Sequence, residues 1–482
     1  YNTIFYVAES TIEKGVIWTG SDCGLVNVTR DGGKTWTNVT PADLPESQIN
    51  SIELSSFDKG VAYISATRYK LNDYGAYAYK TTDYGKTWTK INKGVKADDF
   101  IKVIREDTKN KSILYAGSER GFYLSTDAGS SWQPFQLNLP IVPVTDLMIR
   151  DNDLVAATAG RAFWILDDLG AIQQATTASA VTLFTPKPAY KFGGGTGLPE
   201  AKYKAGQNAP EGVILDYILP EGTDSTLVTL KITDASGKLI RTYSNKKDAS
   251  YAKYPGGPAA ATLLSAKKGH NRFLWNLRNE NVQPDVKNVF VYGSYDGYAV
   301  PPGKYKAQLN FNGTIAETEM TVLANPAIAA TAADWNEQQQ VLASITASIS
   351  EMHQQVNELR KIRKQLVHHS DILKGVKPAE KVLDEAKKLI AGIDAWESNI
   401  VEGRIQNGQD VINWPSKLNV EFFNIKRLAD AADPRITQGI KTRLADLQSQ
   451  WNAEKGKVEA IKKSVAAYNT LYKSQQLEAL IF

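Results

Sequence analysis

The stretch Thr29-Arg30-Asp31-Gly32-Gly33-Lys34-Thr35-Trp36 decides the fold, because close copies of it occur twice more along the chain. It recurs at residues 81–88 as TTDYGKTW and at residues 125–132 as STDAGSSW. The aspartates of successive copies are 52 and then 44 residues apart. This period is typical of a four-stranded propeller blade, so the repeat predicts a β-propeller segment.

Each copy, which we call a box, repeats the same three residue types at fixed spacing. They are Asp31, Gly33 and Trp36; Asp83, Gly85 and Trp88; and Asp127, Gly129 and Trp132. An aspartate at a tight turn accepts backbone N–H hydrogen bonds, and the glycine takes a backbone angle that other residues resist. We expect the tryptophan, on the outgoing strand, to fill space between neighbouring blades.

The three box aspartates allow a second interpretation, in which they are catalytic carboxylates. One carboxylate in each of several separated turns does not form the close acid–base pair that glycoside hydrolysis requires. The pattern therefore favours a structural role for all three aspartates.

A second, shorter repeat precedes two of the boxes. Residues 17–24 (IWTGSDCG) are echoed by residues 114–121 (LYAGSERG), and more weakly by residues 155–161 (VAATAGR). Each copy is a β-rich run that ends in a turn. Together the two repeats assign residues 1–170 to the last blades of a propeller.

The boxes resemble the Asp-box (BNR) repeat of sialidases, xyloglucanases and the sortilin family. The order of the segments 4–10, 29–36, 79–88, 103–107 and 160–169 is similar to that of large sortilin-like propeller proteins of Bacteroidota, commonly labelled glycosyl hydrolases. Such proteins carry more blades ahead of this point, and three or four blades leave open sheet edges. The resemblance therefore implies that the remaining blades are a partner, from the same protein or from another chain.

The resemblance also implies that the boxes lie away from the ligand, which would bind among loops near the central channel. The candidate loop residues are Ser21, Asp22, Arg68, Glu119, Arg120 and Arg161, together with Tyr69. Mixed charges that converge on one axis suit a sugar, a peptide or a carboxylate. The alternative is that these charged groups pair with one another at the channel mouth.

The middle of the chain predicts a linker and then a second β domain. Residues 171–205 contain two prolines and Gly193-Gly194-Gly195, so we expect a linker that is mobile over Lys191–Gly197. Residues 206–325 carry β-rich runs and turn signals, and resemble an immunoglobulin-like β-sandwich. The insert Glu280–Val300 holds three tyrosines, which either bind a partner or pack onto the propeller.

The tail, residues 330–482, predicts an antiparallel helical bundle. Apolar residues recur at steps of three and four from Leu342 to Leu359 and from Ile440 to Val465, which indicates two long helices with matching faces. Shorter helices are expected near 378–396 and 415–432. The basic cluster Lys361–Lys364 is expected on a solvated face. The fold class is thus multidomain β plus α, without any helix expected to span a membrane.

The amino-acid composition limits the partners, metals and cofactors that we expect for this protein. The chain has 56 basic and 52 acidic residues, a net charge of +4 without a basic block, which argues against nucleic acid as a partner. Cys23 is the only cysteine and there are four histidines, so we expect neither a metal site nor a cofactor. The first residues lack a signal-peptide pattern, and we expect them to lie inside a longer protein.

The leading hypothesis is an extracytoplasmic, non-catalytic propeller protein that binds a peptide, a protein or a glycan. The resemblance implies the compartment: periplasm, outer-membrane surface or secreted. One alternative, from the resemblance alone, is a glycoside hydrolase whose active site is completed by N-terminal blades. Another is a structural subunit of a cell-envelope assembly. No catalytic residue is assigned, because no carboxylate pair or sialidase-type cluster can be assembled from this chain.

Overall fold

The computed structural model describes residues 3–175, 181–192, 210–220 and 226–477. The chain divides into two compact units, residues 1–178 and residues 179–482, and each is described by itself.

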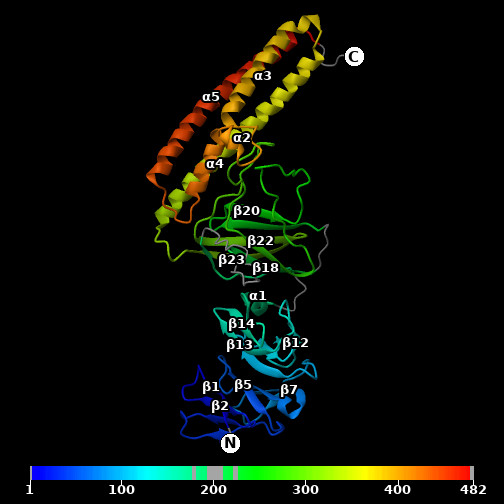
Figure 1. The fold of residues 1–482 in the computed structure, drawn as a ribbon, viewed down its shortest axis with the longest axis vertical. Helices are drawn as coiled ribbons and strands as arrows, with labels where there is room; N and C mark the ends of the chain where they lie inside the picture. The colour runs from blue at the N-terminus through cyan, green and yellow to red at the C-terminus, as the bar shows by residue number, and fades with distance from the viewer. Residues whose placement is uncertain (1–2, 176–180, 193–209, 221–225, 478–482) are drawn as a thin grey trace. The chain divides into compact units, whose positions relative to one another are not determined.

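The first unit consists of four antiparallel sheets in sequence order, which we call blades 1 to 4 (Figure 1). Blade 1 comprises β1 (Ile4–Glu9), β2 (Ile17–Ser21), β3 (Val26–Thr29) and β4 (Thr37–Asn38). Blade 2 comprises β5 (Gln48–Leu54), β6 (Ala62–Arg68), β7 (Asp73–Thr81) and β8 (Thr89–Lys90). Blade 3 comprises β9 (Ile101–Glu106), β10 (Leu114–Ser118), β11 (Phe122–Ser125) and β12 (Gln133–Pro134). Blade 4 comprises β13 (Val144–Arg150), β14 (Asp153–Thr158) and β15 (Phe163–Leu166) and leads into α1 (Gly170–Gln174).

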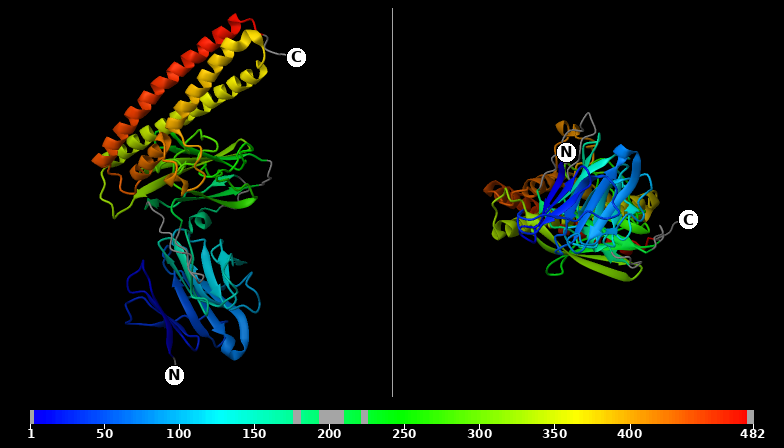
Figure 2. Two further views of the ribbon diagram at one scale, coloured as in Figure 1. Left: turned by 45° about the horizontal axis from the view of Figure 1, so that its top comes forward. Right: turned by 90° about the horizontal axis from the view of Figure 1, so that it is seen from below.

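The blades pack face to face, and their cores lie between neighbouring sheets (Figure 2). Trp18 and Val28 of blade 1 share a buried cluster with Ile52 of blade 2. Equivalent clusters join blade 2 to blade 3 and blade 3 to blade 4. Both faces of each internal blade are therefore apolar, which explains why strands such as β6 and β10 are buried along nearly their whole length.

The second unit begins with two sheets that share one core. The first is ordered β16 (Thr182–Leu183), β18 (Val213–Leu219), β21 (Gly269–Trp275). The second is ordered β17 (Ala189–Lys191), β23 (Thr314–Ala324), β22 (Gly303–Phe311), β19 (Val228–Asp234), β20 (Leu239–Ser244). Phe273 and Trp275 both point into this core, as their two-residue spacing predicts.

The predicted linker is wrong over part of its length. Thr182–Leu183 pairs with β18, and Ala189–Lys191 pairs in parallel with β23. These pairings give the two-residue and three-residue strands β16 and β17 partners that no local pattern reveals. Lys191, expected to be mobile, is only 5% exposed. The rest of the segment expected to be mobile, residues 193–197, lies outside the described residues.

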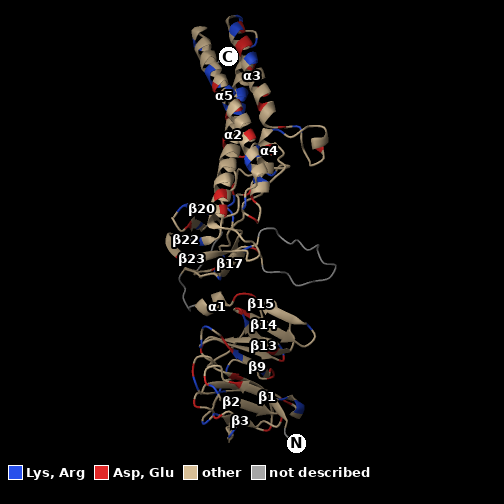
Figure 3. Ribbon diagram, turned by 90° about the vertical axis from the view of Figure 1, so that its left-hand side faces the viewer, with Lys and Arg blue, Asp and Glu red and all other residues tan. Residues whose placement is uncertain are grey.

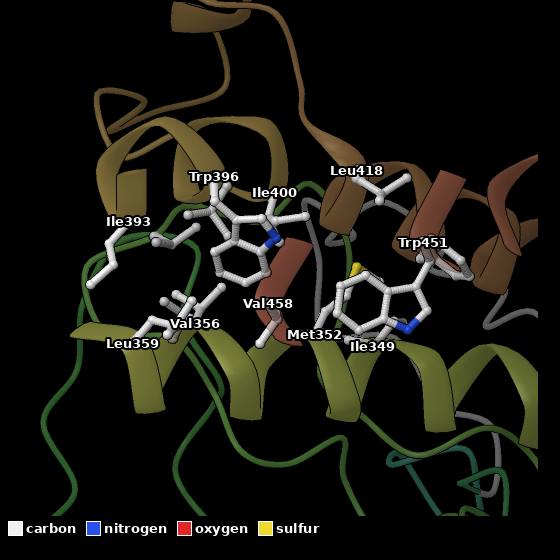
Figure 4. Packing of buried hydrophobic residues seen from close by; sticks show 14 of the residues in the cluster. Ile349, Met352, Val356, Leu359, Ile393, Trp396, Ile400, Leu418, Trp451 and Val458 are labelled. Carbon is white, nitrogen blue, oxygen red and sulfur yellow. The ribbon is translucent and has the colours of Figure 1, made fainter. Parts of the chain in front are cut away.

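Four long helices follow: α2 (Ala332–Ile372), α3 (Glu380–Ile400), α4 (Leu418–Ala429) and α5 (Gln438–Ser474). Helix α2 begins at a capping box, in which Thr331 and Asp334 satisfy each other's backbone N–H groups. Ile349 and Met352 of α2 and Trp451 of α5 meet in one buried cluster (Figure 4). The helices therefore share a core that their three-and-four spacing of apolar residues provides.

The tyrosine-rich insert Glu280–Val300 lies against these helices. Tyr295 is 3% exposed and packs edge-on against Phe423 of α4, and Tyr298 packs against the same cluster. The Tyr292 hydroxyl donates to the carbonyl oxygen of Gly408. The insert therefore packs on the helical core through Tyr295 and Tyr298.

Candidate functional site

The three box turns have one hydrogen-bonding scheme. The Oδ1 atom of Asp31 accepts from the backbone N–H of Thr35 at 2.9 Å, and Oδ2 accepts from the Thr35 hydroxyl at 2.6 Å. Asp83 accepts in the same way from Thr87, and Asp127 from Ser131. Each carboxylate thus bonds to the residue four positions later and closes a turn of five residues.

These bonds keep the box aspartates ionised. Hydrogen bonds from Thr35 hold the pKa of Asp31 well below its usual range, and those from Thr87 lower the pKa of Asp83 to about 2. A carboxylate with so low a pKa does not donate a proton near neutral pH. The geometry therefore supports the structural role of these aspartates.

The box glycines and tryptophans join blades. Gly33, Gly85 and Gly129 all have positive φ. The Trp88 indole donates to the carbonyl oxygen of Val39 in blade 1 and meets Trp18 edge-on. Trp132 donates to the carbonyl oxygen of Ile91 in blade 2.

Trp36 differs from the other two tryptophans, because it is 46% exposed whereas Trp132 is 4% exposed. The expectation that every box tryptophan fills a blade interface is wrong for Trp36. Trp88 and Trp132 pack against the preceding blade, and no blade precedes blade 1 among the described residues.

A cluster of charged groups joins the innermost strands of all four blades. Arg105, on β9, donates from Nη2 to Asp146 of β13 at 2.7 Å and to the Tyr6 hydroxyl of β1 at 3.1 Å. Its Nη1 atom lies 3.6 Å from Oε2 of Glu53, on β5. Because one side chain from each blade meets the same guanidinium, we call Tyr6, Glu53, Arg105 and Asp146 the axial cluster.

Burial sets the protonation of the axial cluster. It raises the pKa of Glu53 to about 7, although Arg105 opposes this shift. Glu53 also accepts from the backbone N–H of Glu106 at 3.2 Å. Asp146 is the more solvent-accessible carboxylate, with its side chain 64% exposed. The cluster therefore combines one acid that titrates near neutrality with one exposed carboxylate.

The candidate loop residues of blade 1 serve local structure. Ser21 is 7% exposed, and its hydroxyl accepts from the backbone N–H of Leu25. Asp22 accepts from the backbone N–H of Thr3 at 2.9 Å. Ser21 holds its own turn, and Asp22 ties that turn to the residue before β1. Within the described residues, neither side chain forms a hydrogen bond with a loop of another blade.

The candidate residues of the other loops are mostly paired. Arg68 contacts Asp73 and donates to the carbonyl oxygen of Glu46. Lys102 lies 2.6 Å from Glu119, and Asp98 lies 2.8 Å from Arg120. The exposed Arg161 guanidinium donates to the carbonyl oxygen of the neighbouring Gly160, and the Arg161 carbonyl oxygen accepts from the Trp164 indole. Within the described residues, no hydrogen bond or ion pair joins a candidate residue of one blade to a candidate residue of another blade.

Exposed aromatic rings lie beside these loops, directly after Arg68. Tyr69 stacks on Phe100 with ring centres 5.4 Å apart and planes 11° apart, and Tyr74 lies against the same ring. Phe100 is 3% exposed, whereas Tyr69 and Tyr74 are 41% and 49% exposed. We call these three residues the aromatic shelf. The Nζ atom of Lys102 lies 5.5 Å from the Phe100 ring, which places a charged group beside it.

The sequence interpretation missed both the axial cluster and Tyr74 and Phe100 of the shelf. A signal for the cluster was present, because Glu53 and Arg105 occupy equivalent positions on the inner strands of consecutive blades. A charged residue at a position that otherwise faces a neighbouring strand indicates an ionic contact. Sequence patterns favour loop positions as candidate sites, because binding residues usually lie on loops, and the axial cluster lies on strands.

The described part of the chain contains neither a cluster of potential metal ligands nor a membrane-spanning helix. No three His, Cys, Asp or Glu side chains there are grouped to hold a metal ion. None of the helices in those residues has an apolar run long enough to cross a bilayer. Acidic and basic residues are interspersed along blades and helices (Figure 3).

Comparison with known proteins finds similarity to sortilin-type proteins in the blade region. Residues 76–159 match the family model "Sortilin, neurotensin receptor 3" (Sortilin-Vps10). A vacuolar protein sorting/targeting protein 10 from Colletotrichum graminicola is 34% identical over 73 residues, which are 15% of this chain and 4% of that protein. The predicted resemblance to sortilin-like Asp-box propellers is confirmed by these matches.

Two further proteins are similar over longer segments. A probable oligoxyloglucan-reducing end-specific xyloglucanase from Neosartorya fischeri is 27% identical over 214 residues, covering 37% of this chain and 25% of that protein. The structure of a GH74 enzyme from Niastella koreensis is 13% identical with a TM-score of 0.29, covering 44% of this chain and 36% of the other. A TM-score this low carries no inference about ligand or activity. The chain spans a quarter or less of the length of the two curated relatives.

Proposed function

We propose that this protein is an extracytoplasmic, non-catalytic propeller protein that binds a glycan, a peptide or a protein at the aromatic shelf. The shelf is the observation that carries the proposal. Tyr69 and Tyr74 are about half exposed, and the buried Phe100 ring supports both. Rings held at the surface in this way offer contact area at a low cost in side-chain entropy, which suits ligand binding.

The charged groups around the shelf add polar contacts. Lys70 donates from Nζ to Gln48, and Lys102 pairs with Glu119. The side chain of Glu119 is 38% exposed, although the oxygen that faces Lys102 is buried, so a ligand can reach the other part of this carboxylate. Hydrogen-bonding groups beside a flat apolar surface match the mixed character of a sugar or a peptide.

A non-catalytic role is supported by the state of the axial carboxylates. Glu53 and Asp146 both contact Arg105, whose guanidinium occupies the space between them. A scissile bond bound between these two carboxylates would have to displace that guanidinium. Its side chain is only 14% exposed and makes three further hydrogen bonds, to Leu147, Ile104 and Tyr6.

The test is a binding screen of the full chain against immobilised glycans and extended peptides. Tyr69→Ala/Tyr74→Ala should lower the affinity for any ligand found by at least about tenfold, since stacked aromatic contacts dominate such sites. Phe57→Ala is the matched control, because Phe57 is 38% exposed and lies in the β5–β6 loop, at the opposite end of the strands. Equal affinity of the double variant and the wild type would overturn the proposal.

One observation favours a glycoside hydrolase as the second candidate. Glu53, with a pKa raised to about 7, is suited to act as a general acid, and Asp146 is an exposed carboxylate. Both contact one guanidinium, so they lie no farther apart than the roughly 9.5 Å limit for a pair of hydrolytic carboxylates. The similarity to a xyloglucanase suggests xyloglucan oligosaccharides as substrate. Release of reducing sugar by the wild type but not by Glu53→Gln would support this candidate.

The two open ends of the blade array support further blades as a partner, from the same protein or another chain. Val7 of blade 1 is 58% exposed, whereas the equivalent residues Ile52, Ile104 and Leu147 are at most 1% exposed. On blade 4, Phe163 is 76% exposed although its equivalent Phe122 is 6% exposed. The envelope-subunit alternative rests on these same apolar ends, which further blades account for equally well.

A further inference from the structure

A polar cavity of about 520 Å³ opens where α2, α3 and the start of α4 meet in the second unit. Its lining comes from α2, from α3, from the loop that follows α3, and from Lys417, the residue before α4. Four of the lining side chains are cationic and three are anionic, so the formal charge of the lining is +1. The volume lies within the range of roughly 300–1,000 Å³ that is typical of small-ligand sites.

Two arginines of this lining are held by carboxylates of the facing helix. The Nε and Nη2 atoms of Arg360 on α2 donate to Oε1 of Glu397 on α3, at 2.9 Å and 2.7 Å. Arg363, three residues further along α2, donates from the same two atoms to Asp394, three residues earlier on α3. Residues three apart share one face of a helix, so the two antiparallel helices bring both pairs to the same side of the bundle.

The third arginine, Arg404, lies on the loop after α3. Its Nε and Nη2 atoms donate to the two carboxylate oxygens of Glu402 at 2.8 Å and 2.7 Å. Glu402 is buried, and the hydrogen bonds from Arg404 hold the pKa of this carboxyl group below its usual range. The carboxylate is therefore ionised at neutral pH, and Arg404 occupies both of its oxygens.

Buried neighbours fix the backbone on which these groups stand. Val401 and Ile405, on either side of the stretch with Glu402 and Arg404, are both buried. Leu418, directly after Lys417, is buried in the core of the helices (Figure 4). The cationic groups are thus held in place before any ligand arrives, which lowers the entropic cost of binding.

These pairings leave more donors than acceptors at the cavity. Within the described residues, Nη1 of Arg363, Nη1 of Arg404 and Nζ of Lys417 form no hydrogen bond. The charge of Lys417 acts on Glu402 only at longer range. The described hydrogen bonds leave one carboxylate oxygen of the lining unused, Oε2 of Glu397. A lining of this kind favours a ligand that carries an anionic group.

We propose that this cavity binds an acidic saccharide, with the carboxylate of a uronic acid residue held among Arg363, Arg404 and Lys417. One carboxylate balances the formal charge of the lining, and a sugar hydroxyl can donate to Oε2 of Glu397. Within the described lining, Val401 is the single residue with an apolar side chain, so a peptide would find few apolar contacts. The site belongs to the second unit and does not depend on binding at the aromatic shelf.

The test uses two disaccharides that differ by one group. Cellobiouronic acid has a carboxylate where cellobiose has a hydroxymethyl group, and isothermal titration calorimetry measures the binding of each to the full chain. The acid should bind at least about tenfold more tightly, because charge-assisted hydrogen bonds are stronger than neutral ones. Lys417→Met should weaken binding of the acid by about tenfold and leave binding of cellobiose unchanged.

Two further variants serve as controls. Lys361→Met is the matched control, because Lys361 lies between Arg360 and Arg363 in the sequence of α2 but is exposed and outside the lining. It should bind the acid as the wild type does. Tyr69→Ala/Tyr74→Ala should also keep the wild-type affinity for the acid, and a loss in this variant would place the ligand on the aromatic shelf and overturn the proposal.

The proposal is also overturned if the two disaccharides bind equally, if neither binds at millimolar concentration, or if Lys417→Met binds the acid like the wild type. N-acetyl-seryl-serine carries one C-terminal carboxylate on a peptide. Tighter binding of this peptide than of the acidic disaccharide would assign the cavity to peptide ends instead. Inorganic sulfate that displaces the disaccharide at equal concentration would indicate a site for any small anion and would likewise contradict the proposal.

Discussion

The indole Nε1 of Trp132 donates a 2.7 Å hydrogen bond to the carbonyl oxygen of Ile91, a residue of the preceding blade. Trp88 makes the equivalent bond of 2.6 Å to Val39. Each box thus stabilises the interface behind it as well as its own turn. This relationship distinguishes the three box tryptophans, which the sequence alone makes equivalent.

Replacement of Trp132 by alanine should therefore cost far more stability than replacement of Trp36. Trp132→Ala empties a buried site and leaves a carbonyl unpaired, with an expected loss of about 3–5 kcal/mol. Trp36 is 46% exposed, so Trp36→Ala should cost under about 1 kcal/mol. Urea unfolding followed by far-ultraviolet circular dichroism of the blade region measures both; equal losses would contradict the interface role.

Alanine substitutions at two box glycines distinguish the cost of a strained backbone angle from the cost of a steric clash. Gly33 and Gly85 both have positive φ, of 95° and 82°. A Cβ atom at Gly85 would lie 2.6 Å from the Val39 Cβ, whereas one at Gly33 has no neighbour closer than 4.0 Å. Gly33→Ala should cost about 1 kcal/mol for the backbone angle alone.

Gly85→Ala should cost that amount and a further ~1–3 kcal/mol, because the interface with blade 1 must shift. The same unfolding experiment on the two variants provides the comparison. If Gly33→Ala were the more damaging change, the packing of Gly85 against Val39 would not be what restricts this position.

Among the axial cluster residues, replacement of Arg105 should cause the largest loss in the free energy of unfolding. Its replacement by methionine leaves Glu53 without its cation and should lower the free energy of unfolding by about 3 kcal/mol. Asp146→Asn should cost about 1 kcal/mol or less, because that carboxylate is 64% exposed. Thermal unfolding of both variants tests this order, and similar melting temperatures for the two would argue against a central role for Arg105.

Local patterns predicted most strands and helices but not the contacts among blades. The box turns and the strands of residues 213–324 follow from alternation and turn residues, which act over a few positions. The axial cluster depends on how Tyr6 and Arg105, 99 residues apart, come together. The short strands β16 and β17 exist because of distant partners, and Trp36 is exposed for want of a neighbour. Contacts between distant residues and the presence of a neighbouring blade cannot be read from a short stretch of sequence.

Lys191 predicts a pH dependence of stability in the second unit. Burial lowers its pKa to about 8, from 10.5 in an unfolded chain, and its Nζ lies 4.4 Å from the centre of the Trp335 ring. Below pH 8 the ammonium is charged in both states, and the folded state bears the full cost of burying it. As pH rises from 8 to 10.5, the folded state releases its proton first, so stability increases.

The increase should approach ~1.4 kcal/mol per pH unit in this window. Urea unfolding at pH 7, 8, 9 and 10 should show it in the wild type and not in Lys191→Met. Lys238→Met, at an exposed position, should keep the wild-type slope. A slope retained in Lys191→Met would assign the effect to another group.

Trp88 and Trp132 each pack on the blade that precedes their own in the sequence. The interfaces between blades must therefore form in a fixed order during synthesis. A ribosome releases blade 1 before the hairpin that carries Trp88 has been made, and blade 2 before the hairpin that carries Trp132. Each blade therefore leaves the exit tunnel with one apolar face uncovered. The next translated blade, with its tryptophan, then packs on that face. Nascent chains of increasing length should accordingly become resistant to protease one interface at a time, with the newest blade always the most vulnerable.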